Sequence, residues 1–281
     1  MAKSVVPAVD RASVIVGALA SNPEGLTFAE LLQCTGIARS TLHNLIQALE
    51  ANQWVHHQEG GARYMLGLTL VRWGAVAVSQ LDLRTVARPI LTALAAELGE
   101  ICHMGVMDWQ DMKVAYIDKI ESARAIPVRS QVGSHMDAHS TALGKLLLAH
   151  ATLNDQMRFL RSESLVAHTP NTITDTDRLF RELVRIRSVG YAVDREENEP
   201  GILCVAAPVR DFRGAVIAAV SATGLMDVSP EHVEKKVKRA REAAGQISHA
   251  MGAPDDETVQ AGVAAEDLEA AGIRPLDQLE R

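Results

Sequence analysis

Polar residues whose types could take part in chemistry stand inside apolar runs in the second half of the chain. Cys204 lies within an apolar run, while Ser221 and Thr223 stand two residues apart in another. Side chains two apart on a strand face the same side, so both hydroxyls can donate hydrogen bonds to one ligand. Cys204 would add a small, weakly polar wall. Asp194, which precedes a charged run, would add a carboxylate.

A cysteine-dependent hydrolase is the alternative function for the same residues. Cys204, His139 and Asp194 are the residue types of such a catalytic site. However, Cys204 lies between Leu203 and Val205, whereas a reactive cysteine usually occupies an exposed, electropositive helix start. Two structural alternatives also stay open: Cys204 as plain core packing, and Asp194 in a solvated charged loop.

Neither a metal nor a cofactor is expected. Cys102, His103, His135 and His139 are ligand types, but they show no tight ligand spacing. Three scattered cysteines form no disulfide framework and fit a reducing cytoplasm. Lys145 is expected to form an ion pair rather than to act as a catalytic base.

A second polar cluster near residue 40 has the composition of a DNA-reading helix. Short hydroxyls at a helix N-terminus can bind phosphate together with backbone N–H groups. Arginine can contact phosphate or guanine, and asparagine suits adenine. The candidate DNA-binding residues are Arg39, Ser40, Thr41, His43 and Asn44, with Arg63 as a further contact to phosphate or the minor groove. The structural alternative is a helical hairpin with a solvated polar face.

The elements around this cluster predict a winged helix-turn-helix over residues 1–66. A helix over 9–21 precedes Thr27-Phe28-Ala29-Glu30, a capping box that opens a short second helix. Gly36 allows a tight turn, and a third helix then runs from about Ala38 to near Asn52. Two short strands, 54–57 and 64–66, predict a hairpin.

Residues 67–81 predict a linker helix that also dimerises. The segment is almost wholly apolar. A helix that is apolar all round must be buried, most simply against a partner chain. A purely structural oligomerisation module is therefore a third interpretation, but it leaves the DNA-reading helix unexplained.

Residues 82–252 predict a mixed domain, which makes the fold class α+β. Helices are expected over 82–100 (with a kink at Pro89), 138–150, a segment capped by 174–177 and ended by Gly190, and a last segment from Ser229. Strands are expected over 101–108, 112–117, 126–132, 191–193, 202–209 and 215–222.

The net charge of −7 lies mostly in the tail. Residues 1–81 hold five basic and five acidic residues, whereas the tail 253–281 holds two basic and eight acidic ones, so we expect an acidic, mobile tail. A neutral DNA-binding domain must rely on few cations, backbone N–H groups and duplication by oligomerisation.

Motifs in both halves resemble the IclR family of bacterial transcription regulators. They are Val9-Asp10-Arg11-Ala12, Gly36–His43, Tyr64–Gly67, His139–Ala149, Gly190–Glu197 and Gly201–Val209, and they cover roughly residues 9–251. The resemblance implies a winged helix-turn-helix, a GAF-like effector-binding domain, and dimers that assemble into homotetramers on DNA. Asn44 departs from the arginine of many members, which bears on the operator sequence. The tail lies outside the resemblance.

The resemblance also implies where the effector binds. The matching positions are Ala142, Leu143, Asp194, Cys204, Ser221 and Thr223, with apolar walls from Ile126, Val128, Met136 and Ile202. The expected ligand is a small organic acid, an amide or an aromatic acid. We therefore predict a cytoplasmic one-component regulator that is not an enzyme, acts as a repressor of transcription, binds double-stranded operator DNA and responds to a small molecule.

Overall fold

The computed structural model describes residues 6–58, 61–121, 130–162, 164–226 and 229–254. The chain divides into two compact units, residues 1–81 and 82–281, which are described one at a time. The tail predicted from residue 253 onward lies almost entirely outside the described residues, as do Ile126 and Val128.

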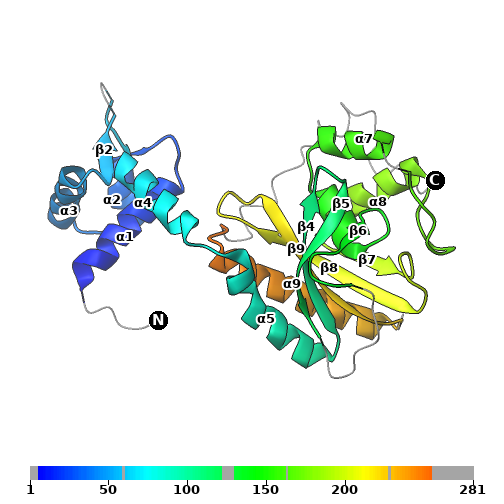
Figure 1. The fold of residues 1–281 in the computed structure, drawn as a ribbon. Helices are drawn as coiled ribbons and strands as arrows, with labels where there is room; N and C mark the ends of the chain where they lie inside the picture. The colour runs from blue at the N-terminus through cyan, green and yellow to red at the C-terminus, as the bar shows by residue number, and fades with distance from the viewer. Residues whose placement is uncertain (1–5, 59–60, 122–129, 163, 227–228, 255–281) are drawn as a thin grey trace. The chain divides into compact units, whose positions relative to one another are not determined.

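Unit 1 is a helical bundle with a small sheet (Figure 1). Its first three helices are α1 (Pro7–Ala20), α2 (Phe28–Thr35) and α3 (Arg39–Ala51). An antiparallel sheet of order β1-β3-β2 is formed by β1 (Leu26–Thr27), β2 (Val55–His57) and β3 (Arg63–Leu66). Ile15, Leu31 and Leu42 are fully buried in one core, so each helix contributes to it. The arrangement is the predicted winged helix-turn-helix.

Local signals in the sequence set the ends of α2 and α3. Thr27 and Glu30 form the predicted capping box, in which each side chain accepts a hydrogen bond from the other residue's backbone N–H. Gly36 ends α2 in the left-handed conformation with φ of 64°, a region that costs glycine little. Strand β1 was not predicted, because two residues are too few to show an alternating pattern.

Helix α4 (Leu68–Ser79) forms where a linker helix was expected, and most of its apolar surface is exposed. Leu68 and Val71 are 80% and 65% exposed, and only Thr69 within the helix is buried. Trp73 packs edge-on against Trp54 with ring centroids 5.1 Å apart, which attaches the helix to the rest of unit 1. Leu68, Val71, Ala75 and Val78 recur at helical spacing along the opposite stripe. Its dimerisation role stays a prediction.

Unit 2 is built on one antiparallel sheet. Among its described residues, six strands have the order β6-β5-β4-β9-β8-β7. The strands are β4 (Ile101–Asp108), β5 (Lys113–Ile120), β6 (His135–Asp137), β7 (Ala192–Arg195), β8 (Ile202–Arg210) and β9 (Val216–Leu225). Helices α6 to α8 lie in the long connection between β6 and β7, whereas α5 precedes the first strand of the sheet and α9 follows the last.

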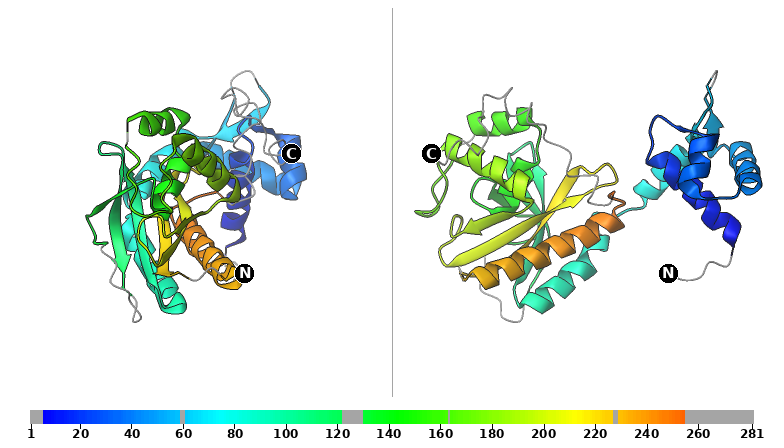
Figure 2. Two further views of the ribbon diagram at one scale, coloured as in Figure 1. Left: turned by 90° about the vertical axis from the view of Figure 1, so that its right-hand side faces the viewer. Right: turned by 180° about the vertical axis from the view of Figure 1, so that it is seen from behind.

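The two faces of this sheet carry separate apolar cores. Helices α5 (Leu83–Leu98) and α9 (Pro230–Ala250) lie side by side on one face, where Leu91, Val220 and Ile247 are buried (Figure 2). Helices α6 (Ala142–Ala149), α7 (Leu153–Ser162) and α8 (Thr176–Val189) cover the other face, where Leu146 and Leu183 are buried. Observed and predicted fold class agree: the chain is α+β.

The elements of unit 2 depart from the predictions in three places. Residues 130–132, the described part of the expected strand 126–132, are not a strand; a turn at Gly133 precedes β6 instead. The helix expected from residue 138 begins at Ala142, because Thr141 is its N-cap and accepts a hydrogen bond from the Gly144 N–H. Helix α7 was not predicted.

Candidate functional site

Helix α3 presents a polar face to solvent. Leu42, Ile46 and Leu49 are buried, so the opposite side of the helix must carry the exposed residues. Arg39, Ser40, His43 and Asn44 are exposed and Thr41 is half-buried. The five predicted residues therefore lie within the first two turns of α3, at its N-terminus, where backbone N–H groups also face outward.

Arg39 and His43 share an aromatic support from α2. The Arg39 guanidinium carbon lies 5.5 Å from the centre of the Phe28 ring, within the range of a cation–π contact. The Phe28 and His43 rings meet edge-on with centroids 6.4 Å apart. These contacts limit the orientations open to both side chains on the polar face.

Arg63 has partners within unit 1. Its Nη1 donates to the Gly25 carbonyl at 2.8 Å and lies 3.2 Å from Glu30 Oε2. Both contacts join β3 to the start of α2. The structure thus gives Arg63 a local structural role, and the predicted contact to DNA phosphate stays a prediction.

A row of polar side chains crosses the sheet of unit 2 on the face covered by α6. Asp194 on β7 lies opposite Cys204 on β8, which lies opposite Thr223 on β9. Residues directly opposite each other in antiparallel strands point to the same side. The Thr223 hydroxyl donates to Cys204 Sγ at 3.1 Å. His103 on β4 is within 3.5 Å of the same hydroxyl through Nδ1.

A small pocket of about 30 Å³ lies over this row, with room for roughly two or three water molecules. Five of the ten predicted effector residues line it: Leu143, Asp194, Ile202, Cys204 and Thr223. Ala142, Met136 and Ser221 do not. Ala142 is the first residue of α6 and is fully buried. Met136 packs against the α6 core, and Ser221 is buried on the pocket side of β9.

Five further lining residues were missed as ligand contacts: His103, Tyr116, Thr141, Asn198 and Glu199. His103 and Tyr116 reach the pocket because strand pairing brings β4 beside β9 and β5 beside β4, and their rings lie 4.9 Å apart. Burial, together with the nearby Lys119, lowers the pKa of His103 to about 3, so the imidazole is neutral. The alternation of buried residues along β5 is the one signal that could have indicated Tyr116.

Asp194 is a buried carboxyl group, only 4% exposed, rather than part of a solvated loop. Its Oδ1 accepts from the backbone N–H of Glu197 at 2.7 Å and of Asn198 at 3.4 Å. Burial is the main cause that raises the pKa of Asp194 to about 7, and the Glu197 carboxylate adds to the rise while Lys145 opposes it. The group therefore changes charge near neutral pH.

This pKa predicts that unit 2 loses stability as the pH rises. Because the pKa of Asp194 is about 7 in the folded chain and 3.8 ordinarily, the folded state holds a proton between these values that the unfolded state releases. Asp194→Asn, which stays neutral, should remove this loss. We expect the unfolding free energy of the variant, relative to wild type, to rise by about 2–3 kcal/mol between pH 5 and pH 8. Urea unfolding at both pH values measures this difference in unfolding free energy, with Glu199→Gln as the control. If Asp194→Asn showed the same pH dependence as wild type, the raised pKa of Asp194 would be refuted.

The surroundings of Cys204 disfavour the thiolate form that a cysteine nucleophile needs. Burial, with a contribution from Asp194, raises the pKa of the thiol to about 11, so it stays protonated at neutral pH. His139, its proposed partner in a hydrolase, forms a hydrogen bond of 2.9 Å to the Val166 carbonyl. The geometry disfavours the hydrolase alternative.

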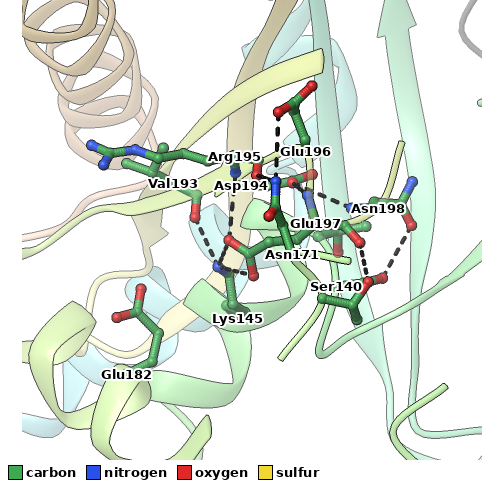
Figure 3. A network of polar contacts seen from close by, with 12 residues as sticks. Ser140, Lys145, Asn171, Glu182, Val193, Asp194, Arg195, Glu196, Glu197 and Asn198 are labelled. Atoms are coloured by element: carbon green, nitrogen blue, oxygen red, sulfur yellow. Dashed lines mark hydrogen bonds and ion pairs between the residues drawn. The ribbon is translucent and has the colours of Figure 1, made fainter. Parts of the chain in front are cut away.

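A polar network holds the loop between β7 and β8, residues 195–201, against α6 and the chain before α8 (Figure 3). Lys145 Nζ donates to the Val193 carbonyl at 2.8 Å and to both Glu197 oxygens at 2.5 and 2.6 Å. Thr172 donates to the Glu197 carbonyl at 2.6 Å, and Ser140 to Asn198 Oδ1 at 3.0 Å. The ion pair expected for Lys145 is therefore present.

A separate exposed group lies around the β4–β5 turn. Asp108, Asp111 and His135 bring one ligand atom each within 4.8 Å of the others. His135 Nε2 already pairs with Asp108 Oδ2 at 3.1 Å, and Asp108 Oδ1 accepts from the Gln110 N–H. These internal contacts account for the cluster without a metal.

Comparison with known families gives matches to both units. Residues 8–59 match the family described as IclR helix-turn-helix domain. Residues 75–249 match the family described as bacterial transcriptional regulator IclR C-terminal.

Individual relatives extend over nearly the whole described chain. The HTH-type transcriptional regulator XynR of Escherichia coli is 31% identical, covering 89% of this chain and 99% of its own length. The DNA-binding transcriptional repressor YiaJ of Escherichia coli is 32% identical, covering 86% of each chain. The crystal structure of the Agobacterium tumefaciens repressor BlcR has a TM-score of 0.76 at 25% identity, covering 90% of this chain and 100% of that one.

Proposed function

The chain belongs to the IclR family of bacterial transcriptional regulators, and on this premise we propose that a small molecule bound in the pocket of unit 2 controls its binding to operator DNA. Like the other members of the family, the chain is a DNA-binding transcriptional regulator and not an enzyme. Within the part of the chain that the structure describes, no helix combines the length and apolar character needed to cross a bilayer. We place the protein in the cytoplasm, where its DNA target is.

The polar face of α3 is the proposed reading surface. Arg39, His43 and Asn44 are exposed there beside the N-terminus of the helix, the end that enters the major groove in such domains. Ser40 and Thr41 are proposed phosphate contacts, together with backbone N–H groups. Because unit 1 is nearly neutral, several copies acting together would supply the affinity.

The buried polar pocket beneath α6 is the observation that carries the effector proposal. Buried polar groups usually have partners, yet the Ser221 hydroxyl is buried without a hydrogen-bond partner of good geometry among the described residues. Together with Asp194, Thr223 and Cys204 it offers donors and acceptors on one face of the sheet. The proposed effector is a small organic acid or amide, or an aromatic acid if the lining moves to admit it, because the pocket is small.

Repression and assembly are proposed from other observations. Two of the similar proteins, YiaJ and BlcR, carry the word repressor in their names, which supports repression by this chain. The exposed apolar stripe of α4 supports a homodimer, and pairing of dimers would give the homotetramer that the family resemblance implies.

A ligand screen tests the pocket. Small carboxylic acids, their amides and aromatic acids are added to the full chain, and thermal stabilisation identifies those that bind. Ser221→Ala should lower the affinity for a ligand found in this screen by roughly tenfold, because one hydrogen bond to the ligand is lost. It should leave the stability of the free protein nearly unchanged, because among the described residues the hydroxyl has only a weak contact with the Cys204 thiol to lose.

Ser248→Ala is the matched control. Ser248 is also buried, but its hydroxyl donates to the Ala244 carbonyl and accepts from the Arg210 N–H on the other face of the sheet. Ser248→Ala should be less stable than wild type and should bind the ligand with the wild-type affinity. Equal affinity of the Ser221→Ala variant and wild type would remove Ser221 from the site.

A further inference from the structure

The end of β7 and the loop that follows it both carry polar residues that line the pocket, and an ion pair holds this loop against α6. Asp194 and Asn198 line the pocket, but Glu197 between them points to Lys145 (Figure 3). The Glu197 backbone N–H in turn donates to Asp194 Oδ1. Any movement of Glu197 must therefore move the residues on both sides of it.

Lys145 is an unusual residue for this position. It is 1% exposed, in the middle of a helix whose other members are all buried and mostly apolar. Burying an ammonium group and a carboxylate is expensive, and a well-packed apolar pair of similar size is often as stable or more so. The ion pair is therefore poorly explained by stability alone.

We propose that Lys145 is a positioning residue for effector binding: through its ion pair with Glu197 it holds Asp194 and Asn198 in the geometry that the effector meets. The inference rests on the proposed function, since it concerns the same pocket. Lys145 touches no ligand itself. It links α6, whose first turn supplies Leu143 to the pocket, to the loop that supplies the facing wall.

The test removes both charges together. Lys145→Met leaves the Glu197 carboxylate buried without its partner and should destabilise unit 2, whereas Lys145→Met/Glu197→Leu removes both members of the pair. We expect the double variant to melt within a few degrees of wild type. Amide hydrogen exchange in peptides covering 193–201 should nevertheless be at least tenfold faster. A ligand from the acid and amide screen should stabilise the double variant less than wild type, by the amount that a tenfold loss of affinity predicts.

A second buried pair on the other face of the sheet supplies the matched control. Lys236, also 1% exposed, lies 2.9 Å from Glu100 and donates to the Leu203 carbonyl. Lys236→Met/Glu100→Leu should leave exchange over 193–201 and ligand affinity as in wild type. If Lys145→Met/Glu197→Leu does not fold, Glu197→Gln keeps the side-chain shape, and the same faster exchange is expected.

Two results would overturn the inference. One is wild-type exchange over 193–201 in the folded double variant, or in Glu197→Gln if that variant is used. The other is faster exchange with unchanged ligand affinity, which would make the pair structural only. If exchange rises but no ligand of wild type alters DNA binding, the proposed function fails instead, so the two failures are distinguishable.

Discussion

Arg39→Ala and Asn44→Ala are each expected to abolish specific DNA binding while leaving the protein folded. Both side chains are exposed on the polar face of α3, so neither contributes to the core of unit 1. A good base contact is worth roughly 1–3 kcal/mol for each half-site, and a dimer loses two of them. We expect specific affinity to fall at least about 30-fold, towards the level of non-specific binding.

The measurement uses fluorescence anisotropy with a duplex that wild-type protein selects from random DNA. Ser13→Ala, an exposed change on α1, is the control and should bind as wild type does. Arg39→Lys should recover only part of the affinity, because lysine keeps the charge but lacks the planar donor pair. If both alanine variants keep the wild-type circular dichroism spectrum, select the same DNA and bind it with unchanged affinity, another surface must read the DNA.

Breaking the apolar stripe of α4 is expected to give a monomer. An exposed stripe of Leu68, Val71, Ala75 and Val78 is best explained by a partner helix that covers it. Val71→Asp would bury a charge without a partner in that interface, at a cost of several kcal/mol. Wild type should sediment as a dimer or larger at micromolar concentration, and the variant as a monomer.

Ala77→Asp is the matched control, because residue 77 is exposed on the opposite side of the same helix. It introduces the same charge into α4 and should leave assembly intact. A wild-type monomer at micromolar concentration, or a Val71→Asp variant that assembles normally, would contradict the dimerisation role.

Features set by local chemistry were readable from the sequence. The Thr27–Glu30 capping box and Gly36 placed the helix-turn-helix, because caps and left-handed turns depend on residues close in the chain. Thr141 shows the limit of such signals. The apolar pattern from residue 138 resembles a continuous helix, but the chain first makes a turn there and Thr141 caps a later start.

The ligand pocket was only half predictable, for a different reason. Asp194 and Cys204 were carried over from family motifs, whereas His103 and Tyr116 arrive through pairing between strands far apart in sequence. Strand register is a tertiary property, and a single sequence does not specify which strands become neighbours. The Lys145–Glu197 contact next to Asn198 joins residues 52 apart, so it too could not be read from the sequence.

The central claim is that one chain couples a ligand pocket in unit 2 to DNA reading by unit 1. The most direct measurement is the affinity of wild-type protein for its selected duplex with and without a saturating hit from the ligand screen. A coupling free energy of about 1–3 kcal/mol is typical of such regulators, so the affinity should change roughly 5- to 150-fold, and Ser221→Ala should require more ligand for the same change. An identical DNA affinity at saturating ligand would contradict the claim.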